Sequence, residues 1–320
     1  MADFDFSTTA SSVIERWGSS LVGKTVVITG ASSGTLGGET AIALASASSV
    51  HNDKDNTAPA HAPTTIILLS RSKTKVHPIL TSISHTSPLT KTHFIPLNLS
   101  DFDSIRAAAK SISQLTGIEL TFAINHLGHF LFTGCLMPLL TRAAAASGDG
   151  GARVINLTSA GYEMGGFREG DWNFENGKTY NPFSAYAQSK TSNILFTMTL
   201  AERYAEDGIR AFAVHPGFIP GTSLLAHLNT IDGDEMNRVS LENTGLPFVI
   251  ESPKTFQQGV ATTLVATLAP DLAPSGSYLA DCQVRPVRGY ACDRELAVRL
   301  WGVSEGLVGG EFGGEMEVEG

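Results

Sequence analysis

The sequence predicts an α/β protein built on a doubly wound parallel sheet, and two observations predict this class. Short runs rich in Val, Ile and Leu alternate with helical patterns along the chain, the order expected when helices cover both faces of a parallel sheet. The first run, 25–29, passes through a glycine-rich turn into a helical pattern at 39–48, as in sheets that bind a nucleotide phosphate. At 320 residues the chain fits one domain of this kind.

The expected elements follow in chain order from apolar runs and capping residues. Each strand is a short run of apolar, mostly β-branched residues, and the predicted strands are 25–29, 65–70, 93–97, 153–158, 210–215 and 277–280. The predicted helices are 39–48, 100–117, 186–207, 253–268 and 294–303, the last capped by Asp293. The domain should span 24–308, with an N-terminal extension at 1–23, a surface insertion at 47–63 and a disordered acidic tail at 309–320.

Composition excludes several classes of partner. The net charge of -9 with no basic stripe argues against nucleic acid. The 3 cysteines lack paired metal spacing, so we expect free thiols, a reducing compartment and no metal site. The acidic N-terminus has no apolar run of the kind found in signal peptides, so the expected location is cytoplasmic. The apolar run 121–140 contains Asn125, His126 and His129, which favours a core or subunit-interface helix over a transmembrane segment.

Candidate functional residues follow the predicted strands. Glycines in the turn 29–37 would let backbone N–H groups approach a pyrophosphate. Arg71 directly follows the second strand, where a guanidinium suits a 2′-phosphate, so NADP is favoured over NAD. Tyr186 and Lys190 are four residues apart on one helix face, so an ammonium could lower the pKa of the phenol. Ser159 and the turn 215–222 lie at the same carboxyl edge of the sheet.

These pieces together resemble the short-chain dehydrogenase/reductase family, especially a retinol-dehydrogenase-like fungal branch with a Rossmann-like fold. The matching motifs are TGASSGTLG at 29–37, NHLGHFLFT at 125–133, RVINLTSAG at 153–161, YAQSKTSNILF at 186–196, VHPG at 214–217 and YLADCQV at 278–284. The resemblance implies that Tyr186 is the catalytic acid/base, that Lys190 tunes it and holds the nicotinamide ribose, that Ser159 orients the carbonyl, and that Asn125 completes a proton relay.

The candidate cofactor contacts combine this resemblance with the motifs above. They are Gly30, Ser32, Ser33, Gly34, Leu36, Gly37, Arg71, Asn98, Tyr186, Lys190, Pro216, Gly217, Ile219 and Thr222. Two single-residue insertions depart from the family pattern: Thr35 in the glycine turn, and Pro220 or Gly221 near the nicotinamide carboxamide. In the family's adenine-binding acid position, Asn98 can still accept a hydrogen bond.

A larger departure is the loss of a separate fourth strand with its Asn-Asn-Ala-Gly turn. Residues 118–124 either begin the long helix that carries Asn125 or form a substitute fourth strand paired with 25–29. We expect the strand, because the helix would leave unpaired backbone groups beside 25–29, and Asn125 would then lie at a strand end with a weakened relay role. His126 and His129 are expected to pack and cap a helix. The loss could be genuine divergence or a coding region read incorrectly.

The predicted function is NADP-dependent hydride transfer to or from a small apolar alcohol or carbonyl substrate. Leucines and Phe248 in 221–250 should close an apolar substrate pocket. The rival hypothesis is a family relic that binds nucleotide weakly or acts as a scaffold. Helices 125–145 and 186–207 are the usual dimer faces in the resembled family, so a homodimer is expected, although Leu195, Met198 and Tyr204 could equally lie in a monomer core.

Overall fold

The strands form at the apolar runs that predicted them. The computed structural model of the chain describes residues 4–49, 62–99, 118–147, 151–220, 232–272 and 274–313. One sheet has the order β1-β2-β3, with every pair parallel. The other has the order β4-β5-β6-β7, in which only the last pair is antiparallel. The strands are β1 (Thr25–Thr29), β2 (Thr65–Ser70), β3 (Lys91–Pro96), β4 (Ala152–Leu157), β5 (Ile209–Val214), β6 (Tyr278–Ala280) and β7 (Gln283–Val284).

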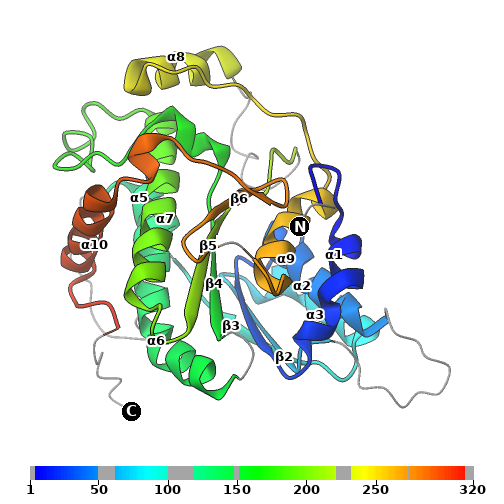
Figure 1. The fold of residues 1–320 in the computed structure, drawn as a ribbon. Coiled ribbons are helices and arrows are strands. Elements are labelled where there is room, and N and C mark those ends of the chain that lie inside the picture. The colour runs from blue at the N-terminus through cyan, green and yellow to red at the C-terminus, as the bar shows by residue number, and fades with distance from the viewer. Residues whose placement is uncertain are drawn as a thin grey trace.

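Helices cover both faces of these sheets, which confirms the predicted α/β class (Figure 1). The helices on one face are α1 (Ala10–Trp17), α2 (Leu36–Ser46), α3 (Lys73–Thr86) and α9 (Phe256–Leu268). The helices on the other are α5 (Leu120–Phe122), α6 (Gly128–Ala146), α7 (Pro182–Arg203) and α10 (Arg294–Val308). Helix α8 (Gly233–Thr244) lies apart from the sheets, over the 3₁₀ turn η4 (Ala160–Met164) that follows β4. Shorter turns of helix are η1 (Gly18–Leu21), η2 (Ala47–Ser49), η3 (Ala123–Leu127) and η5 (Gly289–Ala291).

The N-terminal extension is part of the core. Thr9 caps α1, whose Val13 and Ile14 are buried against α9. Phe4 packs edge-on against Trp17. Several other expectations lie outside the described residues: the helix 100–117, most of the insertion 47–63, the first part of the loop 221–250 with Thr222, and the end of the tail.

The expected substitute strand is wrong, because residues 118–124 begin the long helix instead. The Glu119 carboxylate caps this helix by accepting the N–H groups of Thr121 and Phe122, each at 2.7 Å. Phe122 is fully buried and stacks with Phe167 and Trp172. Capping and aromatic burial therefore outweigh the strand-forming pattern of this segment.

The strands consequently form two sheets rather than one. Within the described residues, β1 pairs only with β2, and β4 pairs only with β5. Val27 in β1 is 42% exposed, which is unusual for the first strand of such a fold. Because water reaches this edge, its unpaired backbone groups avoid the burial cost that had argued against a helix at 118–124. Shared packing joins the halves: Val26 of β1 and Ile155 of β4 contact the same apolar cluster.

The long helix is the one described segment that could span a membrane by length and composition. The stretch Leu120–Ala146 has 27 residues, and an 18-residue segment within it has a mean hydropathy of 1.2. It packs against α7, β4 and β5, and buries residues along its length such as Phe130 and Met137. This packing agrees with the expected core helix.

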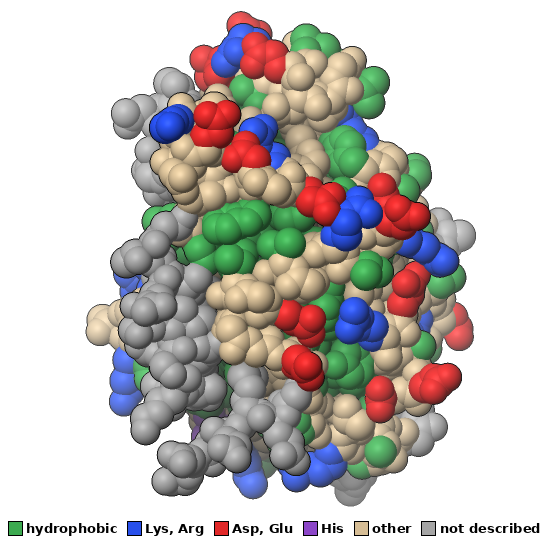
Figure 2. Space-filling view, turned by 90° about the vertical axis from the view of Figure 1, so that its left-hand side faces the viewer, with side chains coloured by type: hydrophobic (Ala, Val, Ile, Leu, Met, Phe, Trp, Pro, Cys, Tyr) green, Lys and Arg blue, Asp and Glu red, His purple; other side chains and the backbone are tan. Residues whose placement is uncertain are grey.

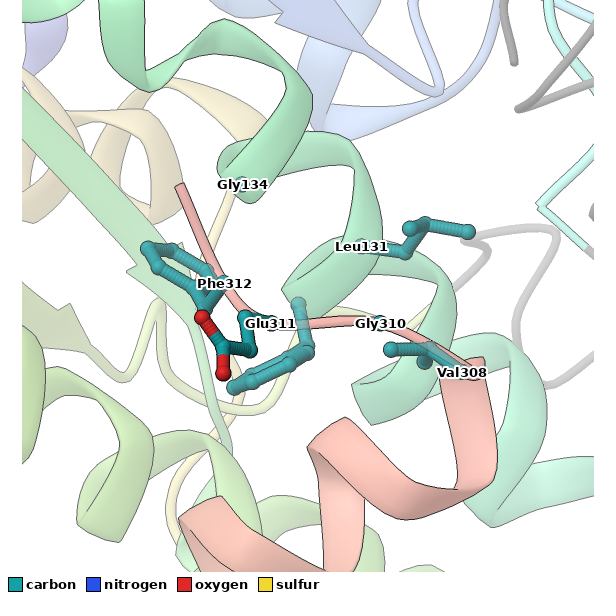
Figure 3. Close-up of a pocket in the computed structure, with 7 residues that line it drawn as sticks. Leu131, Gly134, Val308, Gly310, Glu311 and Phe312 are labelled. Atoms are coloured by element: carbon teal, nitrogen blue, oxygen red, sulfur yellow. The ribbon is translucent and has the colours of Figure 1, made fainter. Parts of the chain in front are cut away.

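The C-terminal segment is more ordered than the sequence predicted. Phe312 lies within 4.5 Å of Trp301 and 4.8 Å of Phe130, measured between ring centroids. It borders a small apolar hollow between α6 and the end of α10 (Figure 3). The expectation that 309–320 has little to bury therefore fails at Phe312, and residues 314–320 lie outside the described part.

Candidate active site

Tyr186 and Ser159 meet at the carboxyl ends of β4 and β5. Asn181 caps α7 and places Tyr186 in its second turn, while Ser159 caps η4 directly after β4. The Ser159 side chain hydrogen-bonds the Tyr186 hydroxyl and accepts the Gly161 N–H at 3.1 Å. Burial raises the pKa of Tyr186, and the bond from Ser159 offsets only part of that rise. The phenol is therefore neutral at ordinary pH in this structure.

Lys190 lies one helical turn beyond Tyr186, as its spacing predicted. Its Nζ is 5.6 Å from the centre of the Tyr186 ring and donates to the Leu157 carbonyl at 3.3 Å. Burial lowers the pKa of Lys190 to about 8. The expected lowering of the phenol pKa by this ammonium is not seen, because burial dominates for both groups and the ammonium faces the ring rather than the hydroxyl.

Asn125 contacts this group from the long helix. It lies in the π-helical turn η3, a rare helical form that often marks functional sites. Its amide donates to the Ser189 hydroxyl at 3.1 Å, and Ser189 in turn donates to the Tyr186 carbonyl at 2.8 Å. The expected strand-end position of Asn125 is therefore wrong, and the structure brings it beside the Tyr186–Lys190 turn.

Of the roles expected for the neighbouring histidines, packing is seen at His126, whereas neither His126 nor His129 is the cap residue of its helix. His126 is fully buried, and its Nε2 lies 2.8 Å from the Ser304 hydroxyl. Burial lowers the pKa of His126 to about 3 and that of His129 to about 4. Among the described residues, no cluster of His, Cys, Asp or Glu has the arrangement of a metal site.

The glycine turn after β1 has the backbone that a phosphate site needs. Gly30 and Gly34 have φ of 65° and 73°, values that favour glycine. A Cβ at Gly37 would lie 2.9 Å from the Gly30 carbonyl oxygen, so only glycine fits there. The inserted Thr35 is the N-cap of α2 and accepts the Gly38 N–H at 3.2 Å. The insertion thus becomes a cap, and the N–H groups of Leu36 and Gly37 still begin the helix, where such groups lack helical acceptors.

The other adenosine-side candidates surround this turn. The Ser32 and Ser70 hydroxyls are 2.7 Å apart, and the Ser33 N–H donates to the Lys75 carbonyl at 2.8 Å. Arg71 follows Ser70 and is exposed. Asn98 lies just after β3, at the same edge of this sheet. No hydrogen bond among the described residues joins the turn to Ser159, Tyr186 or Lys190, so a ligand that contacts both groups would bridge the two sheets.

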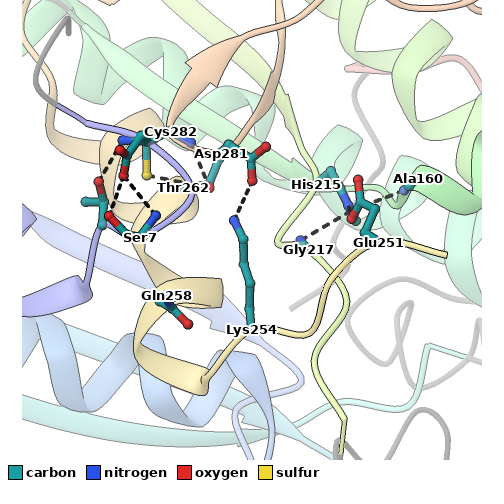
Figure 4. A network of polar contacts seen from close by, with 12 residues as sticks. Ser7, Ala160, His215, Gly217, Glu251, Lys254, Gln258, Thr262, Asp281 and Cys282 are labelled. Atoms are coloured by element: carbon teal, nitrogen blue, oxygen red, sulfur yellow. Dashed lines mark hydrogen bonds and ion pairs between the residues drawn. The ribbon is translucent and has the colours of Figure 1, made fainter.

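The turn after β5 holds the remaining candidates and two residues that the sequence analysis missed. Gly217 has φ of 91° and Ile219 is buried; Pro216 precedes them. His215 Nδ1 accepts the Ala160 N–H at 3.1 Å, and its Nε2 lies 2.6 Å from Glu251 Oε2 (Figure 4). A histidine at the end of a strand was a visible signal, whereas nothing in the sequence marks Glu251 as its partner.

An apolar cluster lies beside Tyr186. Phe248 is buried there with Met164 and Ala187, and Met236 of α8 packs against them. Asn243 ties α8 down by donating to the Met164 carbonyl at 2.9 Å. The described part of 221–250 therefore brings apolar side chains to the phenol, as expected. Leu246 instead is 50% exposed.

These groups lie at the carboxyl edges of the strands of a Rossmann-like α/β fold. No protein-family model matches the chain. Retinol dehydrogenase 12 of Mus musculus is 33% identical over 310 residues, which span 90% of this chain and 87% of that protein. Retinol dehydrogenase 11 of Homo sapiens is 31% identical over 312 residues, with the same shares. The chain therefore belongs to the short-chain dehydrogenase/reductase family of oxidoreductases and is similar to its retinol dehydrogenases.

Solved structures agree with this fold. An uncharacterised protein from Mycobacterium paratuberculosis has a TM-score of 0.61 at 27% identity, covering 90% of this chain and 94% of its own. The NADPH-bound carbonyl reductase from chicken fatty liver has a TM-score of 0.53 at 19% identity, covering 80% and 96%, and this shows a likeness of fold alone.

Proposed function

We propose that this protein is an NADP-dependent oxidoreductase that interconverts an apolar alcohol and its carbonyl compound, with Tyr186 as the acid/base. The observation that carries the proposal is the meeting of Tyr186 with Ser159, Lys190 and Asn125 at one edge of the sheet. These residues come from α7, η4 and η3, so their convergence is a product of the fold.

The side chains divide the proton chemistry among them. Ser159 holds the substrate oxygen beside the Tyr186 hydroxyl, because the serine already bonds that hydroxyl. Tyr186 gives its proton to a carbonyl oxygen in reduction and takes it back in oxidation. Below pH about 8 Lys190 is charged and favours the phenolate that remains. Asn125 supports the helix turn between them through Ser189.

The residues present fit a dinucleotide phosphate. The positive φ at Gly30 and Gly34 and the bare α-carbon at Gly37 leave room for the backbone to approach a pyrophosphate. Exposed Arg71 beside Ser70 supplies a guanidinium for a 2′-phosphate. When bound, the nicotinamide supplies or accepts the hydride.

The apolar substrate class follows from the residues around the phenol. The side chains beside the phenol are apolar and offer a substrate no charged partner; they are Phe248, Met164 and Met236. The similar proteins are named retinol dehydrogenases, which agrees with a long apolar alcohol. Retinol and retinal are therefore the first substrates to try.

The rival proposal, a catalytically impaired relic with a binding or scaffold role, is favoured by the split sheet.

We propose that the chain represents a fungal branch that has lost the family's fourth strand. Among the described residues, β1 and β4 each have one unpaired edge, and Val27 is 42% exposed, which supports that loss. Sequencing the mature transcript would test this loss. Additional coding sequence between residues 99 and 125 would contradict the loss, because it would restore the missing segment.

Two further proposals concern the setting of the enzyme. The cytosol remains the proposed compartment.

A homodimer is also proposed, but α10 packs along α7, so α6 is the better candidate for its interface. Leu139 on α6 is 50% exposed. Apolar side chains also gather in the middle of the face drawn in Figure 2, which is the side of the molecule where α10 lies in Figure 1. Light scattering would show a mass near 33.8 kDa if the protein is instead a monomer.

The experiment that separates the two functions is NADPH turnover. Purified protein is mixed with NADPH and retinal or another apolar carbonyl compound, and absorbance of the reduced cofactor is followed. Tyr186→Phe should abolish turnover, whereas Tyr180→Phe, which removes a hydroxyl from a half-exposed tyrosine outside the site, should not. Absence of turnover together with no NADPH-induced rise in melting temperature would support the relic.

A further inference from the structure

His215 joins three segments of the candidate site. It follows β5 directly, and its side chain is only 5% exposed. Its Nδ1 accepts the Ala160 N–H at 3.1 Å and lies 3.4 Å from the Gly217 nitrogen. Its Nε2 lies 2.6 Å from Glu251 Oε2 (Figure 4). One imidazole thus contacts the turn after β4, the turn after β5 and the chain that returns from α8.

These contacts fix the tautomer of the ring. Both neighbours of Nδ1 are backbone N–H donors, so Nδ1 must be the unprotonated nitrogen. The proton then lies on Nε2, where it is donated to the Glu251 carboxylate. Loss of that carboxylate would leave the Nε2–H without its acceptor, so the ring would be held less firmly against the two backbone donors.

The Ala160 bond bears directly on Ser159. The two residues are adjacent at the start of η4, and Ser159 Oγ is oriented by the Gly161 N–H from the same turn. The Gly217 turn packs closely on the Lys254 side chain, because a Cβ added at Gly217 would lie only 2.6 Å from Lys254 Cδ. Lys254 itself is fixed by Asp281 at 2.6 Å. His215 therefore sets the distance between the Gly217 turn, which Lys254 supports, and the Ser159 hydroxyl.

Glu251 connects this arrangement to the segment over the apolar cluster. It lies three residues after Phe248 in the chain that leaves α8. Just beyond it, the Lys254 N–H donates to the Phe218 carbonyl at 2.7 Å, which anchors the returning chain to the Gly217 turn. The Glu251 side chain is 42% exposed, so its short contact with His215 is made from the solvent side.

We propose that His215 and Glu251 are positioning residues that hold Ser159 in register with the Pro216–Gly217 turn, through a neutral imidazole whose tautomer is set by the two backbone donors and whose Nε2–H is held by the carboxylate. The proposal rests on the proposed oxidoreductase function for its kinetic consequence, although its structural content does not. Neither residue touches Tyr186, so both act through the backbone N–H groups of Ala160 and Gly217.

Paired substitutions separate this role from simple packing. His215→Asn keeps an oxygen acceptor near the position of Nδ1 but has no counterpart of Nε2, whereas His215→Leu removes both. We expect kcat to fall about 100-fold in His215→Leu and less than about tenfold in His215→Asn, with KM for the substrate within about threefold. Glu251→Gln should lower kcat about tenfold in the wild-type background and less than about twofold in the His215→Asn background. Glu242→Gln, the same change in a surface ion pair of α8, should leave kcat unchanged.

Amide hydrogen exchange followed by NMR tests the positioning without turnover. The Ala160 and Gly217 amides should exchange at least about tenfold faster in His215→Leu and in Glu251→Gln than in the wild type, and His215→Asn should keep Ala160 protected. Unchanged exchange in His215→Leu or in Glu251→Gln, or equal losses of kcat from Glu251→Gln in the wild-type and His215→Asn backgrounds, would overturn the proposal. If the wild type has no turnover, the oxidoreductase function fails, and the exchange rates alone decide the positioning role.

Discussion

Substitution of Gly161 by alanine should disable the site by adding a single methyl group. Gly161 lies in η4, and its N–H bonds Ser159 Oγ at 3.1 Å. A Cβ at this position would lie 2.6 Å from Cε1 and 2.9 Å from Cδ1 of the Tyr186 ring. The new methyl group therefore strikes the proposed acid/base directly, and its next contact is Ser159 Oγ at 3.4 Å.

The size of the effect follows from the required movement. Ordinary van der Waals contact begins near 3.4 Å, so the ring must withdraw by about 0.8 Å. A misplacement of about 1 Å at a reacting group costs on the order of 100-fold in rate, or about 2.7 kcal/mol of activation free energy. We expect kcat of Gly161→Ala to fall by roughly 50- to 100-fold, with little change in KM for NADPH, whose proposed phosphate contacts lie at the glycine turn.

The assay is steady-state oxidation of NADPH with the best apolar carbonyl substrate, accompanied by thermal unfolding. Gly166→Ala is the matched control in the next turn, because its added Cβ would lie 3.4 Å from the Tyr290 ring, an ordinary contact. A folded Gly161→Ala protein with wild-type kcat would refute the role of the Tyr186 position, and an equal loss in Gly166→Ala would assign the effect to the loop in general.

Three more predictions address the cofactor, the lysine and the C-terminus. Arg71→Ala should raise KM for NADPH at least about tenfold and leave KM for NADH nearly unchanged, since only NADPH carries the phosphate that the guanidinium would bind; equal effects on both would contradict this role. Burial lowers the pKa of Lys190 from 10.5 to about 8. Between these two pH values the unfolded chain keeps a proton on Lys190 that the folded chain has released. The free energy of unfolding of the wild type should therefore rise with pH across that window. Lys190→Met should therefore be more stable than the wild type in denaturant titrations at pH 7 and should lose that advantage near pH 10.5; an advantage independent of pH would contradict the burial cost. Phe312→Ala should lower the free energy of unfolding by about 2 kcal/mol, less than the roughly 3–5 kcal/mol of a fully buried ring because Phe312 is half-buried, and an unchanged denaturation midpoint would show that its ring does not support the cluster.

Local patterns were enough to predict most elements. Strand β2 is a continuous apolar run and forms as predicted, and Asp293 caps α10 as its position indicated. Tyr186 and Lys190 were found because their spacing within one helix is a property of the sequence alone. Features of this kind depend on neighbours within a few residues.

The predictions failed where tertiary contacts decide. An apolar run such as 118–124 fits both a strand and a buried helix, and burial of Phe122 against Phe167 selected the helix. The capping role of Glu119 was the signal that could have found it. The packing of Phe312 was not predicted, because the residue lies in a Gly/Glu-rich tail and its aromatic partners are far away in sequence. Glu251 lies 36 residues from His215, and only the fold brings them together.

The split sheet changes what holds the two halves of the site in place. The proposed phosphate turn belongs to β1, whereas Ser159 follows β4, and no described ladder joins these strands. Their relative position depends on two apolar clusters, one joining Val26 of β1 to Ile155 of β4 and the other joining Ile67 of β2 to Val154 of β4. Side-chain packing is less directional than a strand ladder, so the distance between the two candidate subsites is held by apolar burial rather than by hydrogen bonds. A dinucleotide that contacted both would add the missing connection, and its binding should therefore rigidify this protein more than one whose sheet is continuous.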